Sequence, residues 1–130
     1  MELVPVKIIT PDRVFYEGDV SMIEFTSSEG DLGIYPRHVA MTVIVAPGML
    51  ILHEENGTKK AALHAGFAEI LPDKITILAE VAEWPDEIDK NRAEEARIRA
   101  ERRLAAPDGI DVARAELALS KALLRLKVIQ

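Results

Sequence analysis

The sequence predicts a β plus α protein, with an amino-terminal antiparallel β-sandwich or barrel followed by a carboxyl-terminal antiparallel two-helix hairpin. Three observations predict it. The first 80 or so residues alternate short β-rich runs with turn signals, whereas 14 of the 15 residues in Arg92–Ala106 are Ala, Glu, Arg or Leu. Pro107-Asp108-Gly109 then separates that run from a second amphipathic one. We therefore expect a β-domain over residues 1–85 and a helical hairpin over residues 86–130.

The expected strands are short runs rich in β-branched and aromatic residues, namely Val4–Thr10, Arg13–Glu17, Val20–Thr26, Leu32–Tyr35, Met41–Val45, Met49–Glu54, Thr58–Ala65, Phe67–Leu71 and Lys74–Ala79. Turn signals such as Pro11-Asp12, Ala46-Pro47-Gly48 and Pro72-Asp73 separate them. Because no helical stretch interrupts this series, the spacing is typical of a sandwich or barrel.

The Asn56-Gly57 pair is the clearest local turn signal. Both residues tolerate the positive φ of a type I′ turn, so we expect a hairpin centred on them. The pairs expected across that turn are Glu55–Thr58, Glu54–Lys59 and Leu50–Leu63.

Two helices are expected after the strands, the first within the run Arg92–Ala106 and the second from an N-cap at Asp111 to about Val128. Apolar residues at helical spacing form one stripe on each helix, namely Ala93, Ala96, Ala100 and Leu104 on the first and Ala115, Leu119, Ala122, Leu126 and Ile129 on the second. The first stripe is mostly alanine, which buries little area. The hairpin should therefore be marginally stable by itself and able to change partners.

Composition and charge limit the class of protein. The chain has no cysteine and a net charge of −6, so disulfides and thiolate metal sites are excluded and a reducing cytoplasm is favoured. Residues 1–87 carry 6 Lys/Arg against 15 Asp/Glu, whereas residues 88–130 carry 10 against 7. The acidic portion argues against nucleic-acid binding. No run is long enough for direct membrane insertion, and the amino terminus does not resemble a secretory signal.

The motifs of enzymes are missing from the sequence. It contains no Gly-x-Ser-x-Gly elbow and no phosphate-binding Gly-Lys-Ser/Thr loop. Among the three histidines, His38, His53 and His64, the latter two would lie too far apart along the predicted hairpin to share a metal. We therefore expect no catalytic residue and no metal site.

Asp89 and Arg92 admit two interpretations on spacing alone. At i and i+3 they share one side of a helix with Ala93 and Arg99, where a carboxylate and guanidinium groups could hold a phosphate-bearing ligand. The alternative is an acidic residue in the first helical turn with a weak ion pair. The cluster Arg97, Arg99, Arg102 and Arg103 is likewise either a solvated face or a docking face for an acidic partner.

Four blocks in order give the sequence a resemblance to a known family. They are Ser28-Glu29-Gly30-Asp31-Leu32-Gly33-Ile34-Tyr35-Pro36-Arg37-His38, Pro47-Gly48, Gly66-Phe67-Ala68-Glu69-Ile70 and Val112-Ala113-Arg114-Ala115-Glu116-Leu117-Ala118. Together they resemble the epsilon subunits of bacterial F-type ATP synthases over nearly the whole chain. The resemblance implies a sandwich of about ten strands, and a β-domain that contacts gamma and the c-ring of the synthase. It assigns Asp31 and His38 to the loop that meets the c-ring.

A further part of the resemblance concerns ATP. Ile88-Asp89-Lys90-Asn91-Arg92-Ala93 is similar to the Ile/Leu-Asp-x-x-Arg-Ala motif with which some bacterial epsilon subunits bind ATP. The positions that the resemblance assigns to ATP are Glu83, Ile88, Asp89, Arg92, Ala93, Arg99, Lys121 and Arg125. Lys121 stands where such members tend to have arginine, and lysine lacks the bidentate fork. ATP would be a regulatory ligand that needs no Mg, and no other cofactor is implied.

The resemblance implies a non-catalytic rotor subunit, peripheral on the cytoplasmic face of the cell membrane, whose extended hairpin meets the alpha and beta subunits and inhibits ATP hydrolysis. A rival hypothesis is a free-standing β-protein that binds a small molecule and dimerises through its helical tail. The rival predicts a stable homodimer in size-exclusion chromatography, whereas the rotor subunit would be a monomer that joins gamma. An enzyme is a third option, which the missing motifs disfavour.

Overall fold

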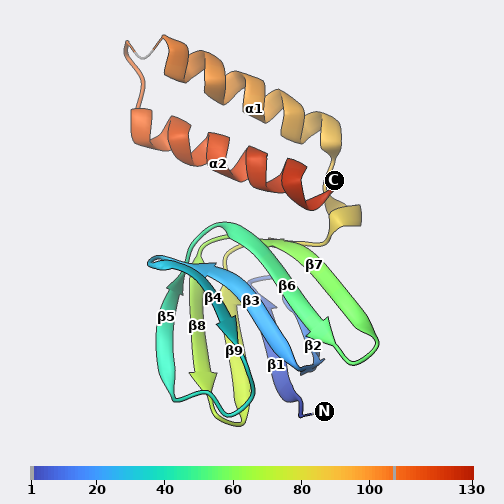
Figure 1. Ribbon diagram of the computed structural model, residues 1–130. Helices are drawn as coiled ribbons and strands as arrows, with labels where there is room; N and C mark the ends of the chain where they lie inside the picture. Colours follow the sequence, from blue (N-terminus) through green and yellow to red (C-terminus); the bar gives the residue numbers. More distant parts are fainter. Residues whose placement is uncertain (1, 107) are drawn as a thin grey trace. The chain divides into compact units, whose positions relative to one another are not determined.

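The computed structural model describes residues 2–106 and 108–130. The chain divides into two compact units, one ending at Glu83 and the other beginning at Trp84. The first unit contains only β-strands and the second contains the helices (Figure 1). Neither helix has the length and apolar character of a membrane span, as far as the described residues go.

The first unit is a ten-stranded sheet folded over into a sandwich, which confirms the predicted fold class. Its strands are β1 (Val4–Thr10), β2 (Arg13–Val20), β3 (Met22–Ser27), β4 (Gly30–Ile34), β5 (Met41–Val45), β6 (Gly48–Glu54), β7 (Gly57–Leu63), β8 (Gly66–Leu71), β9 (Lys74–Ala79) and β10 (Ala82–Glu83). The strand order is β10-β7-β6-β3-β5-β8-β9-β1-β2, with β4 paired to β3. Strands β1 and β9 pair in parallel, whereas every other described pair is antiparallel.

Alternating burial along the strands builds an aliphatic core. In β1 the side chains of Val4, Val6 and Ile8 are buried, while the intervening positions face outward. The largest fully buried side chains are Phe25, Ile8, Ile23, Ile34, Leu50, Leu52, Leu63, Ile70, Ile75 and Ile77. A single aromatic ring among ten side chains agrees with the low aromatic content of the sequence.

A contact between β2 and β6 closes the sandwich. The hydroxyl of Tyr16 donates to Oε2 of Glu54 at 2.5 Å, and Nζ of Lys59 lies 3.6 Å from the other oxygen of the same carboxylate. Burial, together with the Glu54 hydrogen bond, raises the pKa of the Tyr16 phenol above its ordinary value. The phenol therefore remains a donor throughout the neutral range.

The bounds of nine strands were predicted closely, and the tenth strand, β10, was missed. Val4–Thr10, Met41–Val45 and Lys74–Ala79 are confirmed as predicted, and the other predicted strands differ by one to three residues at an end. Strand β10 was not predicted, because two residues are too few to show alternation.

The predicted register of the β6–β7 hairpin is wrong. Glu54 pairs with Gly57 and Leu50 with Ala61, so the two turn residues are Glu55 and Asn56. The turn is not type I′, because Asn56 does not have positive φ, whereas Gly57 does (+152°). A slip of two residues leaves every side chain on its face of the sheet, so the apolar pattern could not distinguish the two registers.

The second unit begins with a 3₁₀ turn, η1 (Pro85–Glu87), followed by helices α1 (Lys90–Ala105) and α2 (Val112–Val128). The predicted N-cap Asp111 is confirmed, since its Oδ1 accepts from the backbone N–H of Arg114 at 3.1 Å. Of the predicted Pro107-Asp108-Gly109 turn, Pro107 lies outside the described residues. Gly109 has a φ of +75°, as the end of a tight turn between helices requires.

The two helices pack against each other in antiparallel order (Figure 1). The predicted stripes form the seam, in which Ala93, Ala100, Ala115 and Ala122 are each at most 3% exposed. The other residues of the stripes are half-buried, namely Ala96, Leu104, Leu119, Leu126 and Ile129. Alanines bury so little area that we expect this seam to contribute only a few kcal/mol.

Helix α2 carries apolar residues on a second side as well. Leu124 and Val128 are buried although they lie off the predicted stripe, and Leu117 on the same side is 46% exposed. Helix α2 therefore offers more than one apolar surface for packing.

Substitution of Gly66 tests how tightly the sheet is built. A Cβ at Gly66 would lie 2.0 Å from the carbonyl oxygen of Leu78, which is backbone and cannot move aside. We expect Gly66→Ala to lower the free energy of unfolding by about 1–3 kcal/mol in denaturant titrations. Gly33→Ala is the matched control, because its nearest neighbour is Met22 Sδ at 3.6 Å, and should change stability by less than about 0.5 kcal/mol. Equal midpoints for the two variants would contradict this packing.

Candidate functional site

The first turn of α1 contains the centre of the candidate ATP motif. Asp89 is the N-cap, and its Oδ1 accepts from the backbone N–H of Arg92 at 3.1 Å. Ala93 is buried in the seam, and Ile88 is half-buried just before the cap. The guanidinium of Arg92 is exposed and has no ion-pair partner among the described residues. Helix capping thus explains the aspartate at position 89, and packing in the seam explains the alanine at position 93. Neither role explains the arginine at position 92.

The same motif occurs again 22 residues later, a repeat that sequence reasoning missed although the printed sequence shows it. Ile110, Asp111, Arg114 and Ala115 match Ile88, Asp89, Arg92 and Ala93, and a glutamate follows both copies. The two copies share their local structure, because each aspartate caps its helix at 3.1 Å and each alanine is buried. The second copy is therefore an internal control for the first.

Basic residues gather on one face of the hairpin. Helical spacing places Arg92 and Arg99 beside the seam of α1, and Lys121 and Arg125 beside the seam of α2 on the corresponding side. Antiparallel packing then puts all four on one face, which we call the basic face. Arg92 lies in the first turn of α1, which adjoins the half of α2 that holds Lys121 and Arg125, whereas Arg99 lies just past the middle of α1. Four of the predicted ATP positions thus share one face of the hairpin.

Most of the acidic side chains of α1 lie away from the basic face. Arg97 pairs with Glu94 and with Glu101 on the opposite side of the helix, and the hydrogen bond that Arg97 donates to Glu94 raises the pKa of its guanidinium. Arg99, Arg102 and Arg103 have no such partner among the described residues. Arg92 and Arg99 of the basic face therefore keep their positive charge.

Glu83, the remaining predicted ATP position, ends strand β10 in the first unit. It pairs with Ala62 of β7, and its Oε1 lies 3.0 Å from Nε2 of His64. The imidazole of His64 is buried, whereas the side chain of Glu83 is 22% exposed. The carboxylate is thus held at the edge of the sheet.

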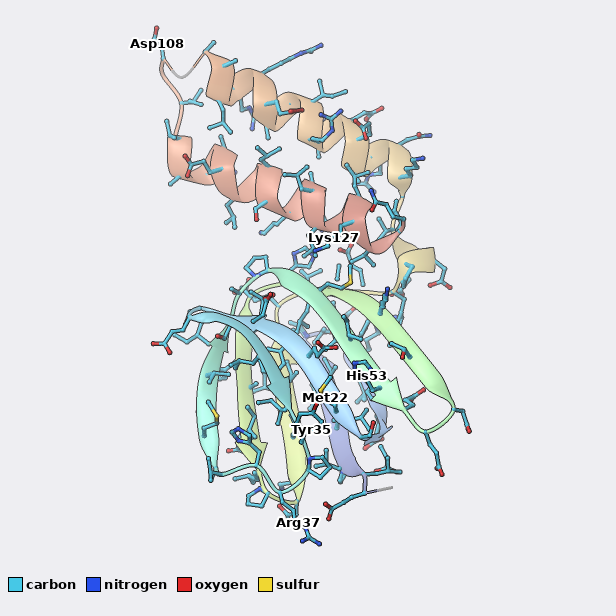
Figure 2. The ribbon with its side chains drawn as sticks, in the orientation of Figure 1. Met22, Tyr35, Arg37, His53, Asp108 and Lys127 are labelled. Carbon is cyan, nitrogen blue, oxygen red and sulfur yellow. The ribbon has the colours of Figure 1, made fainter. Side chains whose placement is uncertain are left out.

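The two candidate c-ring residues do not share a loop, contrary to the prediction. Asp31 belongs to β4, where its Oδ1 accepts from the hydroxyl of Thr26 at 2.8 Å. His38 lies beyond the other end of that strand, in the loop between β4 and β5 (residues 35–40). This loop presents the exposed side chains of Tyr35 and Val39, and Arg37 in it has φ +64°. Figure 2 shows the side chains of Tyr35 and Arg37. The predicted loop therefore consists of a strand and a turn.

His53 forms a second histidine–glutamate pair. Its Nε2 lies 2.6 Å from Oε2 of Glu24, across strands β6 and β3, and it stands beside Met22 (Figure 2). Within residues 2–106 and 108–130, no three His, Cys, Asp or Glu side chains come close enough to hold a metal ion. The His53–Glu24 pair thus offers a hydrogen bond between two strands.

An apolar row crosses the outer face of five strands. Neighbouring strands pair Ile44 with Phe67, Phe67 with Leu78, Leu78 with Ile9, and Ile9 with Val14, so the five side chains share one face. Four of them are about half exposed or more, from Leu78 at 46% to Ile44 at 62%. We call these five residues the outer apolar row. A contiguous exposed row of this kind is typical of a protein-binding surface.

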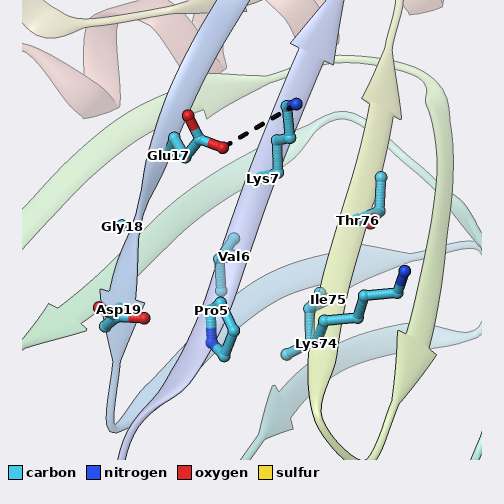
Figure 3. A pocket seen from close by; sticks show the side chains of 9 residues that line it. All are labelled: Pro5, Val6, Lys7, Glu17, Gly18, Asp19, Lys74, Ile75 and Thr76. Atoms are coloured by element: carbon cyan, nitrogen blue, oxygen red, sulfur yellow. Dashed lines mark ion pairs between the residues drawn. The ribbon is translucent and has the colours of Figure 1, made fainter.

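Next to this row the same face becomes polar. A groove of about 380 Å³ crosses β2, β1 and β9, and the ion pair Lys7–Glu17 at 3.9 Å lies along it (Figure 3). Lys74 and Asp19 line the same groove. Its mixed charges and open shape do not define a site for one small ligand.

Comparison with solved structures shows the fold first. The fold is similar to that of a chain in the cryo-EM structure of the Euglena gracilis mitochondrial ATP synthase, with a TM-score of 0.87, 21% identity and coverage of 98% of this chain and 82% of that chain. A central stalk/c-ring structure of the Tetrahymena thermophila mitochondrial ATP synthase gives a TM-score of 0.63 at 15% identity, covering 99% and 98%. These likenesses define a β-sandwich with an appended helical pair.

Sequence comparison then gives the family. Residues 3–85 match the beta-sandwich domain of the ATP synthase delta/epsilon chain, and residues 86–130 match its long alpha-helix domain. The ATP synthase epsilon chains of Halalkalibacterium halodurans and Bacillus pumilus are 44% and 43% identical, each covering 98% of both chains. This chain belongs to the ATP synthase delta/epsilon family, as the resemblance predicted. The epsilon chain is a non-catalytic subunit, and membership favours this class over the rival small-molecule binder.

Proposed function

We propose that this chain is a central-stalk subunit that couples the rotor of an ATP synthase to its membrane ring and inhibits ATP hydrolysis through a mobile, ATP-binding hairpin. One observation carries the proposal, namely the contrast between the two units. The sandwich buries many large side chains, most of them aliphatic, whereas the helices meet on four buried alanines. A rigid docking unit and an easily opened regulatory unit follow from that contrast.

In this proposal the outer apolar row is the surface that docks on gamma. Burying four exposed apolar side chains would supply the hydrophobic centre of an interface, and the polar groove beside it would lie at the rim. The loop that carries His38, together with Asp31 of β4, contacts the c-ring. The chain then lies peripherally on the cytoplasmic face of the cell membrane and meets the membrane only through its partners.

ATP binds to the basic face in the proposed regulatory state. The guanidinium groups of Arg92, Arg99 and Arg125 and the ammonium of Lys121 bind the phosphates, so Mg is not needed to neutralise them. Ile88 and Ala93 are the proposed apolar neighbours of the base, and the carboxylate of Asp89 accepts hydrogen bonds from amino or hydroxyl groups of the nucleoside. Glu83, in the first unit, stays an expectation from the resemblance. Asp89 already caps α1, so only part of its accepting capacity serves the ligand.

Two states of the hairpin then regulate hydrolysis. With ATP bound the hairpin stays folded, and without ATP it extends beside gamma, meets the alpha and beta subunits and blocks rotation in the hydrolysis direction. ATP at a hundred times its dissociation constant favours the bound state by about 2.7 kcal/mol. A shift of this size changes the state because the alanine seam contributes only a few kcal/mol.

The repeated motif allows a matched test of ATP binding. We expect Arg92→Ala to weaken binding of Mg-free ATP to the isolated chain by at least about tenfold in calorimetry, because a charged hydrogen bond to phosphate is lost. Arg114→Ala, at the same position of the second copy, should leave affinity within about twofold. If the wild-type chain does not bind ATP at millimolar concentration, or if both substitutions weaken ATP binding equally, the proposed nucleotide site is contradicted.

Gamma docking is tested on the outer apolar row. We expect Phe67→Asp to abolish co-purification with gamma, because it places a charge in the centre of the proposed interface. Leu123→Asp, an equally exposed apolar position on α2, is the control and should co-purify normally. If the Phe67→Asp variant still co-purifies with gamma, the outer apolar row is not the gamma-binding surface.

Removal of the hairpin tests inhibition. A chain ending at Glu87 keeps all ten strands, so we expect it to assemble with the synthase and to raise ATP hydrolysis severalfold over the full chain. The measurement compares ATP hydrolysis rates of two purified complexes, which contain equal amounts of the full-length or of the shortened subunit. Unchanged hydrolysis would remove the inhibitory role while leaving the rotor role intact.

A further inference from the structure

The tip of the β6–β7 hairpin contains an asparagine that is followed by glycine, and the proposed function leaves both residues unused. Glu55 and Asn56 are the turn residues, and Gly57 begins β7 as the partner of Glu54. Asn56 and Gly57 are exposed. A Cβ added at Gly57 would meet no atom within 4 Å apart from its chain neighbours. The tip is therefore open to water and sterically unprotected.

An asparagine before a glycine is chemically labile. The backbone nitrogen of the following residue attacks the side-chain amide carbon of the asparagine, and a five-membered succinimide ring forms. A side chain on the following residue hinders this approach, and glycine has none. At the hairpin tip the strand pairing that restrains this nitrogen is the closing pair Glu54–Gly57, and such ends open locally at little cost in free energy.

We propose that Asn56 is a site of spontaneous deamidation. The nitrogen of Gly57 forms a bond to Cγ of Asn56, the bond from Cγ to Nδ2 breaks, and the proton of the Gly57 N–H leaves with the amide group as ammonia. Water then opens the ring. Attack of water at Cγ restores the backbone and leaves aspartate. Attack at the main-chain carbonyl carbon of Asn56 leaves isoaspartate, in which the chain runs through the β-carbon.

Both products place a new carboxylate beside two glutamates. Glu54 accepts from the hydroxyl of Tyr16 at 2.5 Å and lies 3.6 Å from Nζ of Lys59, so the added charge is next to the contact that closes the sandwich. Isoaspartate also lengthens the main chain of the turn. Because the chain already has a net charge of −6, the modification makes aged copies more acidic still and marks them at this tip.

The other asparagine of the chain is a matched control. Asn91 is also exposed, in the first turn of α1. The backbone nitrogen that would attack its side chain belongs to Arg92 and already donates to Oδ1 of Asp89 at 3.1 Å. The helix holds that nitrogen in place, and the arginine side chain hinders its approach. Equal exposure would predict equal rates, whereas the local backbone predicts a much faster reaction at Asn56.

The test incubates the full-length chain at mildly alkaline pH and follows both asparagines by mass spectrometry of proteolytic peptides. Replacement of the amide NH₂ by OH raises the mass of the peptide that contains the reacted residue. We expect Asn56 to convert at least about tenfold faster than Asn91. Asp108-Gly109 can form the same ring without losing ammonia, so the mass, rather than the isoaspartate content, assigns the site.

Two variants identify the reacting groups. Asn56→Ser removes the side-chain amide, so the more acidic form that accumulates in wild type on isoelectric focusing should be absent. Gly57→Ala should slow the reaction at Asn56 at least about tenfold, because a Cβ hinders the attacking nitrogen. Gly57 has a φ of +152°, which strains alanine, so the melting temperature of this variant is recorded as well.

A measurement on wild type in urea does not depend on the folding of any variant. Unfolding should accelerate the reaction at Asn91, whose attacking nitrogen is then released from the helix, and should change the rate at Asn56 by less than about threefold. If Asn56 reacts no faster than Asn91 in the native chain, or if urea accelerates both asparagines equally, the native turn protects Asn56 and the inference is overturned.

Discussion

The proposed regulation depends on the alanine seam between α1 and α2. Alanine at Ala93, Ala100, Ala115 and Ala122 lets the helices pack, yet each methyl group removes little apolar surface from water. The sandwich has the opposite character, with large aliphatic side chains filling its interior and Tyr16 closing β2 onto β6. Opening the helices therefore costs far less free energy than opening the sheet.

This difference gives each unit its part in the proposed function. A docking surface such as the outer apolar row is useful only on a scaffold that keeps its shape, and the pairing of β5, β8, β9, β1 and β2 fixes that row. A regulatory element needs two arrangements close in free energy. In the proposed function the basic face would supply the differential contact, because ATP would neutralise charges that an extended hairpin would present to other subunits.

The sequence predicted what local rules determine. Strands bounded by Pro, Asp and Gly signals were found where expected, and Asp111 caps α2 as its residue type predicts. It did not predict strand β10 or the β6–β7 register, because two residues show no alternation and a two-residue slip changes no face. The basic face and the His64–Glu83 contact depend on packing between distant residues, whereas the repeated Ile-Asp-x-x-Arg-Ala motif was visible in the sequence but missed.

Native-state amide hydrogen exchange tests the central claim most directly. Opening free energies measured for α1 and α2 should be several kcal/mol below those of β8 and β9, and ATP should slow exchange in the helices while leaving the strands unchanged. Helices and strands that exchange with one common free energy, insensitive to ATP, would show that the alanine seam does not make the hairpin separately mobile.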